Sequence, residues 1–180
     1  SLLGCVVAAV IALIGMNTVT LAGQRLVIQG NGKLAIVSAE GKIEWERPWG
    51  GIHDIHVLKN GNILVQEGSQ KIAEIDVKTK QVVWSYHAGK QNGNEGKKVE
   101  VHAFQPLENG HIMIAESGPA RIIEIDRDGK LHKETKLKVN KPSTHSDTRL
   151  ARQLADGNYL VSHENDGCVR EYSGKSGDVV

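Results

Sequence analysis

Two histidines and an arginine recur at one position of a repeated segment, and their side chains can bind anions or transfer protons and groups. His53, His102 and Arg149 each lie eight residues before the glycine of an NG or DG turn. Imidazolium and guanidinium groups both donate hydrogen bonds to sulfate, phosphate or carboxylate. A histidine whose pKa is tuned by a neighbouring carboxylate can also act as a nucleophile or general base. This position is therefore the main candidate for function.

Further polar residues lie near this position in the sequence. The candidate binding residues are His53, Asp54, His102, Asp147, Arg149 and His163. The sequence does not identify a catalytic residue, and the weak candidates for a nucleophile are His53, His102 and His145. A structural interpretation stays open, in which these groups hydrate a water-filled channel or hydrogen-bond an adjacent loop. His56 is expected to point away from its neighbours and to pack between sheets.

No metal site and no cofactor are predicted. The sequence has no CxxC motif and no metal-type cluster of cysteine and histidine. The oxygen-rich turns HENDG (163–167) and DRDG (126–129) lack the spacing of a calcium loop with its distal glutamate, so they are interpreted as ordinary turns. If the N-terminal segment with Cys5 is removed, Cys168 is alone and no intrachain disulfide forms.

The elements that must position the candidate residues are three repeated β-hairpins. Each has a short apolar alternation before and after its turn: IHVL-KNG-NILV, HAFQPL-ENG-HIMIA and LARQL-ADG-NYLVS. Asn-Gly and Asp-Gly supply the positive φ of a tight hairpin turn. A third strand follows each hairpin and carries an equivalent glutamate, and a fourth strand follows in the first two repeats. The turn glycines and the glutamates are Gly61, Gly110, Gly157, Glu74, Glu124 and Glu171.

Four short strands in each period of 47–50 residues predict an all-β fold, a β-propeller with four-stranded blades. The first strand of a blade lines the central channel, so the three repeats should bring His53, His102 and Arg149 together at one mouth. Residues 25–46 resemble strands two to four of a further blade. The propeller domain is expected over 25–180 as about three and a half blades. We interpret the chain as a fragment, with a self-contained four-bladed protein as the alternative.

One repeat, KIAEIDVKTKQVVWSY (71–86), resembles that of the pyrroloquinoline-quinone-type (PQQ-type, or quinoprotein-like) propeller family. The motif is carried by Asp76, Thr79, Lys80, Val82, Val83 and Trp84. In that family the tryptophan docks one blade on its neighbour, and Trp45 occupies the same place one repeat earlier. The resemblance covers about residues 25–180 and implies a fold rather than an activity. The vicinal disulfide and calcium site of the family's alcohol dehydrogenases are not recognisable, which argues against a quinone cofactor.

HDIHVLKNGNILV (53–65) and HSDTRLARQLADGNYLVSHE (145–164) are also similar to repeats of bacterial arylsulfotransferases. That resemblance implies sulfuryl transfer between phenols through a histidine nucleophile. The first expectation is nonetheless recognition of a small molecule, glycan or protein on the channel face. An arylsulfotransferase-like enzyme and a purely structural module are the alternatives.

The composition and the N-terminal segment narrow the class of protein. A net charge of +1 with 24% charged residues gives no excess of basic charge for nucleic acid. The five lysines of KLHKETKLKVNK (130–141) are interpreted as a solvated strand edge. Residues 2–15 are uncharged and suit a signal peptide (1–22) better than a full membrane span. A periplasmic or secreted protein is predicted, with membrane contact only through an uncleaved N-terminal anchor.

Overall fold

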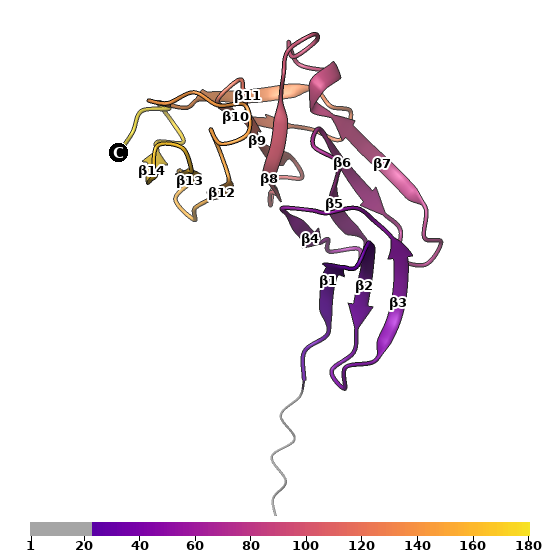
Figure 1. The fold of residues 1–180 in the computed structure, drawn as a ribbon. Coiled ribbons are helices and arrows are strands. Elements are labelled where there is room, and N and C mark those ends of the chain that lie inside the picture. The colour runs from indigo at the N-terminus through magenta and orange to yellow at the C-terminus, as the bar shows by residue number, and fades with distance from the viewer. Residues whose placement is uncertain (1–22) are drawn as a thin grey trace, which may run out of the picture.

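The computed structural model describes residues 23–180, and the segment predicted as a signal peptide or anchor lies outside the described residues. Residues 23–180 form fourteen β-strands and one short 3₁₀ helix in four antiparallel sheets. The sheets follow one another along an arc in chain order (Figure 1). Within these residues no helix has both the length and the apolar character that crossing a bilayer requires.

Each sheet is built from strands that are consecutive in the chain, and we number the sheets as blades 1 to 4. Blade 1 contains β1 (Leu26–Gly30), β2 (Lys33–Val37) and β3 (Ile43–Pro48). Blade 2 contains β4 (Ile55–Val57), β5 (Ile63–Glu67), β6 (Lys71–Ile75) and β7 (Val82–His87), and η1 (Ala88–Lys90) follows it. Blade 3 contains β8 (Glu100–Pro106), β9 (Ile112–Ser117), β10 (Arg121–Ile125) and β11 (Leu131–Lys136). Blade 4 contains β12 (Leu150–Gln153), β13 (Tyr159–His163) and β14 (Cys168–Tyr172).

The three repeated hairpins close in the same way. Gly61, Gly110 and Gly157 have φ angles of +85°, +85° and +88°, as predicted for the tight turns. Each glycine N–H donates to the carbonyl of the leucine three residues earlier, at 2.9, 3.0 and 2.9 Å. The repeat found in the sequence is therefore a repeat of backbone hydrogen bonds, and equivalent residues occupy equivalent places in blades 2, 3 and 4.

The repeated glutamate of the third strand stabilises the hairpin beside it. Glu74 accepts a hydrogen bond from Asn62 at 2.6 Å, and Glu171 accepts one from Asn158 at 2.7 Å. In blade 3 the equivalent Glu124 instead accepts hydrogen bonds from Tyr159 at 2.5 Å and Gln153 at 3.1 Å, both in blade 4. The recurrence of this residue thus has a structural cause.

Each pair of neighbouring blades encloses its own apolar core, because the middle strands are buried on both faces. In β5, Ile63 and Val65 pack against blade 1, while Leu64 packs against blade 3. In β9, Ile112 and Ile114 face blade 2. Met113 and Ala115 of the same strand face blade 4 and its Tyr159. This two-sided burial explains why these strands are continuously apolar in the sequence rather than alternating.

The tryptophan of the fourth strand docks on the next blade, as the PQQ-type repeat implies. The indole Nε1 of Trp84 donates to the carbonyl oxygen of Arg127 at 2.6 Å, and the Arg127 guanidinium lies 4.2 Å from the ring centroid. The Arg127 side chain also forms an ion pair with Glu74. Trp45 is placed similarly against Lys80 of blade 2. These contacts link blade 1 to blade 2 and blade 2 to blade 3.

Candidate functional site

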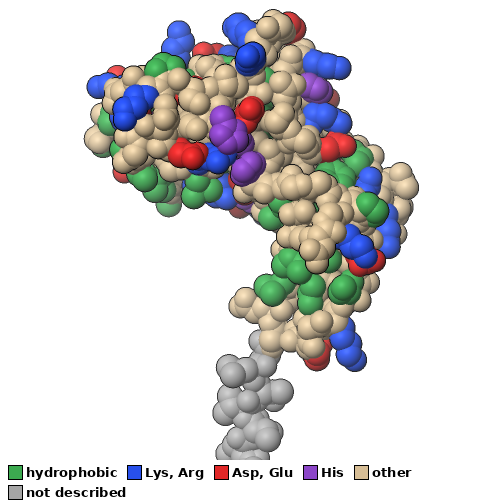
Figure 2. All heavy atoms as spheres, in the orientation of Figure 1, with side chains coloured by type: hydrophobic (Ala, Val, Ile, Leu, Met, Phe, Trp, Pro, Cys, Tyr) green, Lys and Arg blue, Asp and Glu red, His purple; other side chains and the backbone are tan. Residues whose placement is uncertain are grey.

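The inner strands bring the repeated histidines together. His53 lies just before β4, His102 lies within β8, and their ring centroids are 4.6 Å apart. Arg149 precedes β12 and forms an ion pair with Glu164. Figure 2 shows histidine, acidic and basic side chains gathered on one face in the region of β8 and β12. We call the group of His53, Glu100, His102, His145 and Arg149 the channel-mouth cluster.

His53 lies before the first inner strand rather than on it, although the sequence places it at the start. The main-chain N–H of His53 donates to the side chain of Gln66 at 2.6 Å, and that of Ile55 donates to its neighbour Asp54 at 3.0 Å. The N–H groups of His53 and Ile55 thus donate to side chains rather than to the main chain of β5. The strand β4 begins only at Ile55. The ring of His53 is left exposed beside the His102 ring.

His102 is the buried centre of the cluster and is 2% exposed. The pairing of β8 with β9 shifts between Val101 and Ala103, so His102 is the extra residue of a β-bulge. Bulges redirect side chains and are common beside functional sites. The Nδ1 of His102 lies 2.9 Å from the carbonyl oxygen of Thr148, and its Nε2 lies 3.0 Å from Oε2 of Glu100.

Glu100 links two histidines from different segments. Its Oε2 lies 2.8 Å from Nδ1 of His145, which belongs to the loop between β11 and β12. The rings of His102 and His145 are edge to face, with centroids 5.1 Å apart. His145 is a candidate from the sequence, whereas Glu100 is not. The only sequence signal is the spacing of Glu100 two residues before His102 on one strand, which by itself indicates little.

The electrostatics of the cluster favour a neutral His53 and an ionised Glu100. Burial lowers the pKa of His53, and the nearby His102 and Arg149 lower it further. Burial alone raises the pKa of the Glu100 carboxyl, but the adjacent ring nitrogens of His145 and His102 outweigh it, so that pKa is below its usual value. The Nη1 atom of Arg149 is buried and has no hydrogen-bond partner within residues 23–180.

Three of the six candidate binding residues hold the fold together. Asp54 is 5% exposed, and both its carboxylate oxygens accept hydrogen bonds from Arg152, at 2.7 and 2.8 Å. Asp147 is 1% exposed and accepts main-chain N–H groups at 2.6 and 3.0 Å. His163 is also buried, with Nδ1 at 2.7 Å from the Asp147 carbonyl and Nε2 at 2.9 Å from the Tyr172 hydroxyl. We do not include these three residues in the site.

His56 makes the contact between blades that the sequence predicts. Its Nε2 lies 2.7 Å from the carbonyl oxygen of Phe104 in blade 3, and its ring is edge to face with the Phe104 ring. A residue on β4 thus packs on β8, and this contact helps to hold the two inner strands side by side.

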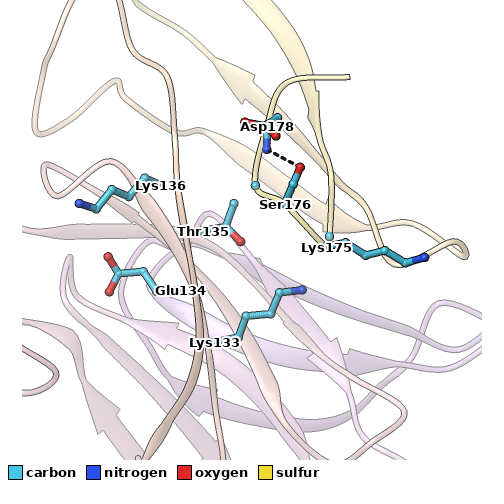
Figure 3. Close-up of a pocket in the computed structure, with 9 residues that line it drawn as sticks. Lys133, Glu134, Thr135, Lys136, Lys175, Ser176 and Asp178 are labelled. Carbon is cyan, nitrogen blue, oxygen red and sulfur yellow. Dashed lines mark hydrogen bonds between the residues drawn. The ribbon is translucent and has the colours of Figure 1, made fainter.

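Two cavities lie elsewhere. One of about 520 Å³ lies between the hairpin ends of blades 2 and 3, where Leu58 and Leu107 line it. The other, of about 570 Å³, lies between β11 and the turn after β14 (Figure 3). Lys133 lines this cavity. In the strand register Lys133 lies opposite Glu124, as Trp84 lies opposite Glu74 in blade 2. Blade 3 therefore has a lysine at the position of the docking tryptophan. Neither cavity is lined by the channel-mouth cluster.

The comparisons with known proteins agree with this architecture. Residues 11–86 match the family model of a PQQ-type repeat described as outer membrane protein assembly factor BamB. No curated protein matches the chain. A protein of unknown function from Bacteroides caccae is similar in structure, with 24% identity and a TM-score of 0.70 over 88% of this chain and 57% of that one.

Two further solved structures are similar at lower identity. Virginiamycin B lyase from Staphylococcus aureus has 19% identity and a TM-score of 0.56, covering 88% of this chain and 55% of its own. BamB from Moraxella catarrhalis has 16% identity and a TM-score of 0.56, covering 88% of this chain and 48% of its own. The chain therefore spans about half the length of the structures that it matches, and the likeness is one of fold.

Proposed function

From the premise that the chain is a β-propeller protein with PQQ-type repeats, we propose that it binds a small anionic molecule at the channel-mouth cluster. The observation that carries the proposal is the buried Nη1 of Arg149, which has no partner within residues 23–180. A buried donor without an acceptor is costly, and a guanidinium binds sulfate, phosphate or carboxylate strongly. An anion beside the guanidinium, whose side chain is 30% exposed, would supply an acceptor.

The surroundings of Arg149 support this choice of ligand. The acidic groups nearby are already engaged, since Glu164 pairs with Arg149 itself and Glu100 contacts two histidines. The exposed ring of His53 offers a further polar contact from a different blade. A ligand in this position would touch residues of blades 2, 3 and 4 at once.

Replacement of Arg149 by alanine is expected to weaken anion binding at least about 10-fold, the effect of losing one charge-assisted hydrogen bond. Isothermal titration calorimetry with sodium sulfate, sodium phosphate and sodium benzoate measures this. The matched control is Arg25→Ala, because Arg25 forms an exposed ion pair with Glu44 in the region of blade 1. Absence of binding by the unaltered protein, or equal binding by Arg149→Ala, would contradict the proposal.

An arylsulfotransferase-like enzyme is the second candidate, and one observation favours it. His53 is exposed and its pKa is lowered, so its imidazole is neutral and nucleophilic near neutral pH. His102 is too deeply buried for that role. A ring nitrogen of His53 would attack sulfur as the donor S–O bond breaks and the phenolate leaves. A second phenol would then displace the imidazole and release a proton.

The enzyme and the binding module differ in one assay. If His53 is the nucleophile, the protein releases 4-nitrophenol from 4-nitrophenyl sulfate in the presence of phenol, and His53→Ala abolishes the release. His132→Ala is the control, because His132 pairs with Asp126 away from the cluster. Absence of release would contradict the enzyme proposal. We propose a periplasmic or secreted location for either activity, on the basis of the uncharged segment 2–15.

A further inference from the structure

We infer that Glu100, His102 and His145 form a site for a divalent transition-metal cation such as Zn²⁺. One carboxylate oxygen and two imidazole nitrogens, one from each residue, all lie within 4.8 Å of one another. Oε2 of Glu100 is 3.0 Å from Nε2 of His102 and 2.8 Å from Nδ1 of His145. Two imidazoles and one carboxylate suit zinc or ferrous iron, whereas calcium and magnesium prefer oxygen ligands.

The hydrogen bonds of His102 provide the main physical argument. The carbonyl oxygen of Thr148 can only accept a hydrogen bond. Nδ1 of His102 must therefore carry a proton and donate that hydrogen bond. In the neutral ring Nε2 then has a lone pair, and this lone pair faces a carboxylate oxygen of Glu100. Two acceptors at that distance repel each other unless a positive charge lies between them. A metal cation provides that charge, and a second proton on His102 is the alternative source of it.

The partners of His102 are also those of a metal ligand. A metal-bound histidine almost always donates its other ring N–H to a carboxylate or a backbone carbonyl, which fixes the orientation and the tautomer of the ring. His102 has such a partner in Thr148, and its burial at a β-bulge prevents the ring from turning away. The imidazole is therefore held with Nε2 toward the other two ligands before any cation binds.

The two contacts of Glu100 are close to the spacing that a cation needs, and the two histidine nitrogens lie within 4.8 Å of each other. Metal–ligand bonds of about 2.0–2.1 Å in a tetrahedral site separate the ligand atoms by about 3.3 Å. The two contacts of Glu100 are shorter than this by a few tenths of an ångström. The His145 side chain is 56% exposed and that of Glu100 is 27% exposed, so both can move outward by that amount. His53, beside His102, or a water molecule can occupy the fourth position.

The site can be tested with Co²⁺ and Zn²⁺ on the full chain without a histidine tag, after treatment with a chelator and in a buffer without oxyanions. We expect one equivalent of Co²⁺ to bind with the visible absorption bands of a four- or five-coordinate ion, and Zn²⁺ to displace it. Because each variant removes one ligand, Glu100→Gln and His145→Ala should each weaken binding at least about 100-fold. His132→Ala should bind as the unaltered protein does.

The variants distinguish two cases. In one, the cation binds at these three ligands, and in the other it binds adventitiously at surface histidines. His145 and Glu100 are partly exposed, so both variants are expected to fold, which circular dichroism checks. The inference is overturned if no ion binds, or if binding survives both substitutions. It is also overturned if nitrogen-15 spectra of the metal-free and metal-treated protein both show two protons on the His102 ring. The inference does not depend on the anion proposal, because the titration contains no anionic ligand.

Discussion

Replacement of Asp54 by alanine is expected to lower the free energy of unfolding by about 3 kcal/mol, as when one partner of a buried ion pair is removed. Asp54 is 5% exposed and binds the Arg152 guanidinium of blade 4 with both carboxylate oxygens. It also accepts the main-chain N–H of Phe104 in blade 3 at 3.0 Å. The variant therefore leaves a partly buried arginine without its carboxylate partner and a buried N–H without an acceptor, and it removes one link among the three inner segments. Urea denaturation measures the loss.

The control and the pH dependence make this prediction specific. Asp128→Ala changes an exposed aspartate in a turn and should alter stability by no more than about 0.5 kcal/mol. Burial alone raises the pKa of Asp54, but hydrogen bonds from His56, Arg152 and Phe104 outweigh it and the pKa is lowered. Asp54 therefore stabilises the fold above its unfolded pKa of about 3.9, and the contribution is lost as pH falls through the lower folded pKa. Asp54→Asn should make the free energy of unfolding depend less on pH in this acidic range. A loss below 1 kcal/mol for Asp54→Ala would contradict the prediction.

Replacement of Gly118 by alanine is expected to cost about 3 kcal/mol, from a positive φ and a backbone clash together. Gly118 has a φ of +96°, and a Cβ atom there would lie 2.4 Å from the carbonyl oxygen of Lys98. Its N–H donates to Asp147 at 3.0 Å. The added methyl group would push the turn after β9 away from the segment before β8 and from the loop before β12. The first of these segments leads directly into Glu100 at the start of β8 and the second carries His145, so the metal affinity should fall as well.

The variant Gly110→Ala is the control that has the backbone strain of a positive φ without the steric clash. Gly110 has a φ of +85°, but no atom lies within 4 Å of the place that its Cβ would take. Its substitution should therefore cost only the strain of the left-handed conformation, about 1 kcal/mol, and leave metal binding unchanged. Thermal or urea unfolding of the two variants measures the difference. Equal losses for Gly118→Ala and Gly110→Ala would contradict the proposed contact with Lys98.

The blades could be predicted from the sequence because the hairpin signal is local. Three Asn-Gly or Asp-Gly dipeptides predict the positive φ of Gly61, Gly110 and Gly157. Counting back eight residues from those glycines reaches positions within two residues of an inner strand or on it. The same count predicts that His53 and His102 lie close together, and their ring centroids are 4.6 Å apart in the structure. Equivalent glutamates of the third strands were also found in this way, although their cause is structural.

The rest of the site depends on segments that do not repeat. His145 lies on the loop between β11 and β12, and no periodicity relates it to Glu100. The bulge that redirects His102 arises in the pairing of β8 with β9, which single-residue patterns do not reveal. The structural role of Asp54 was equally hidden, because its partner Arg152 is 98 residues away in the sequence. Spacing therefore predicted that His53 and His102 lie close together, but it could not predict which residues of the candidate set stabilise the fold.

The central claim is that the segment before β4, the strand β8 and the loop between β11 and β12 bring His53, His102 and His145 together. Nuclear Overhauser effects between histidine ring protons test it most directly, with assignments from His53→Gln and His145→Gln. We predict cross-peaks between His53 and His102 and between His102 and His145, whose ring centroids are 4.6 and 5.1 Å apart. The His163 and Tyr172 rings, within one blade and 5.8 Å apart, are the internal reference. A cross-peak for that reference pair with none between the three histidines would contradict the claim.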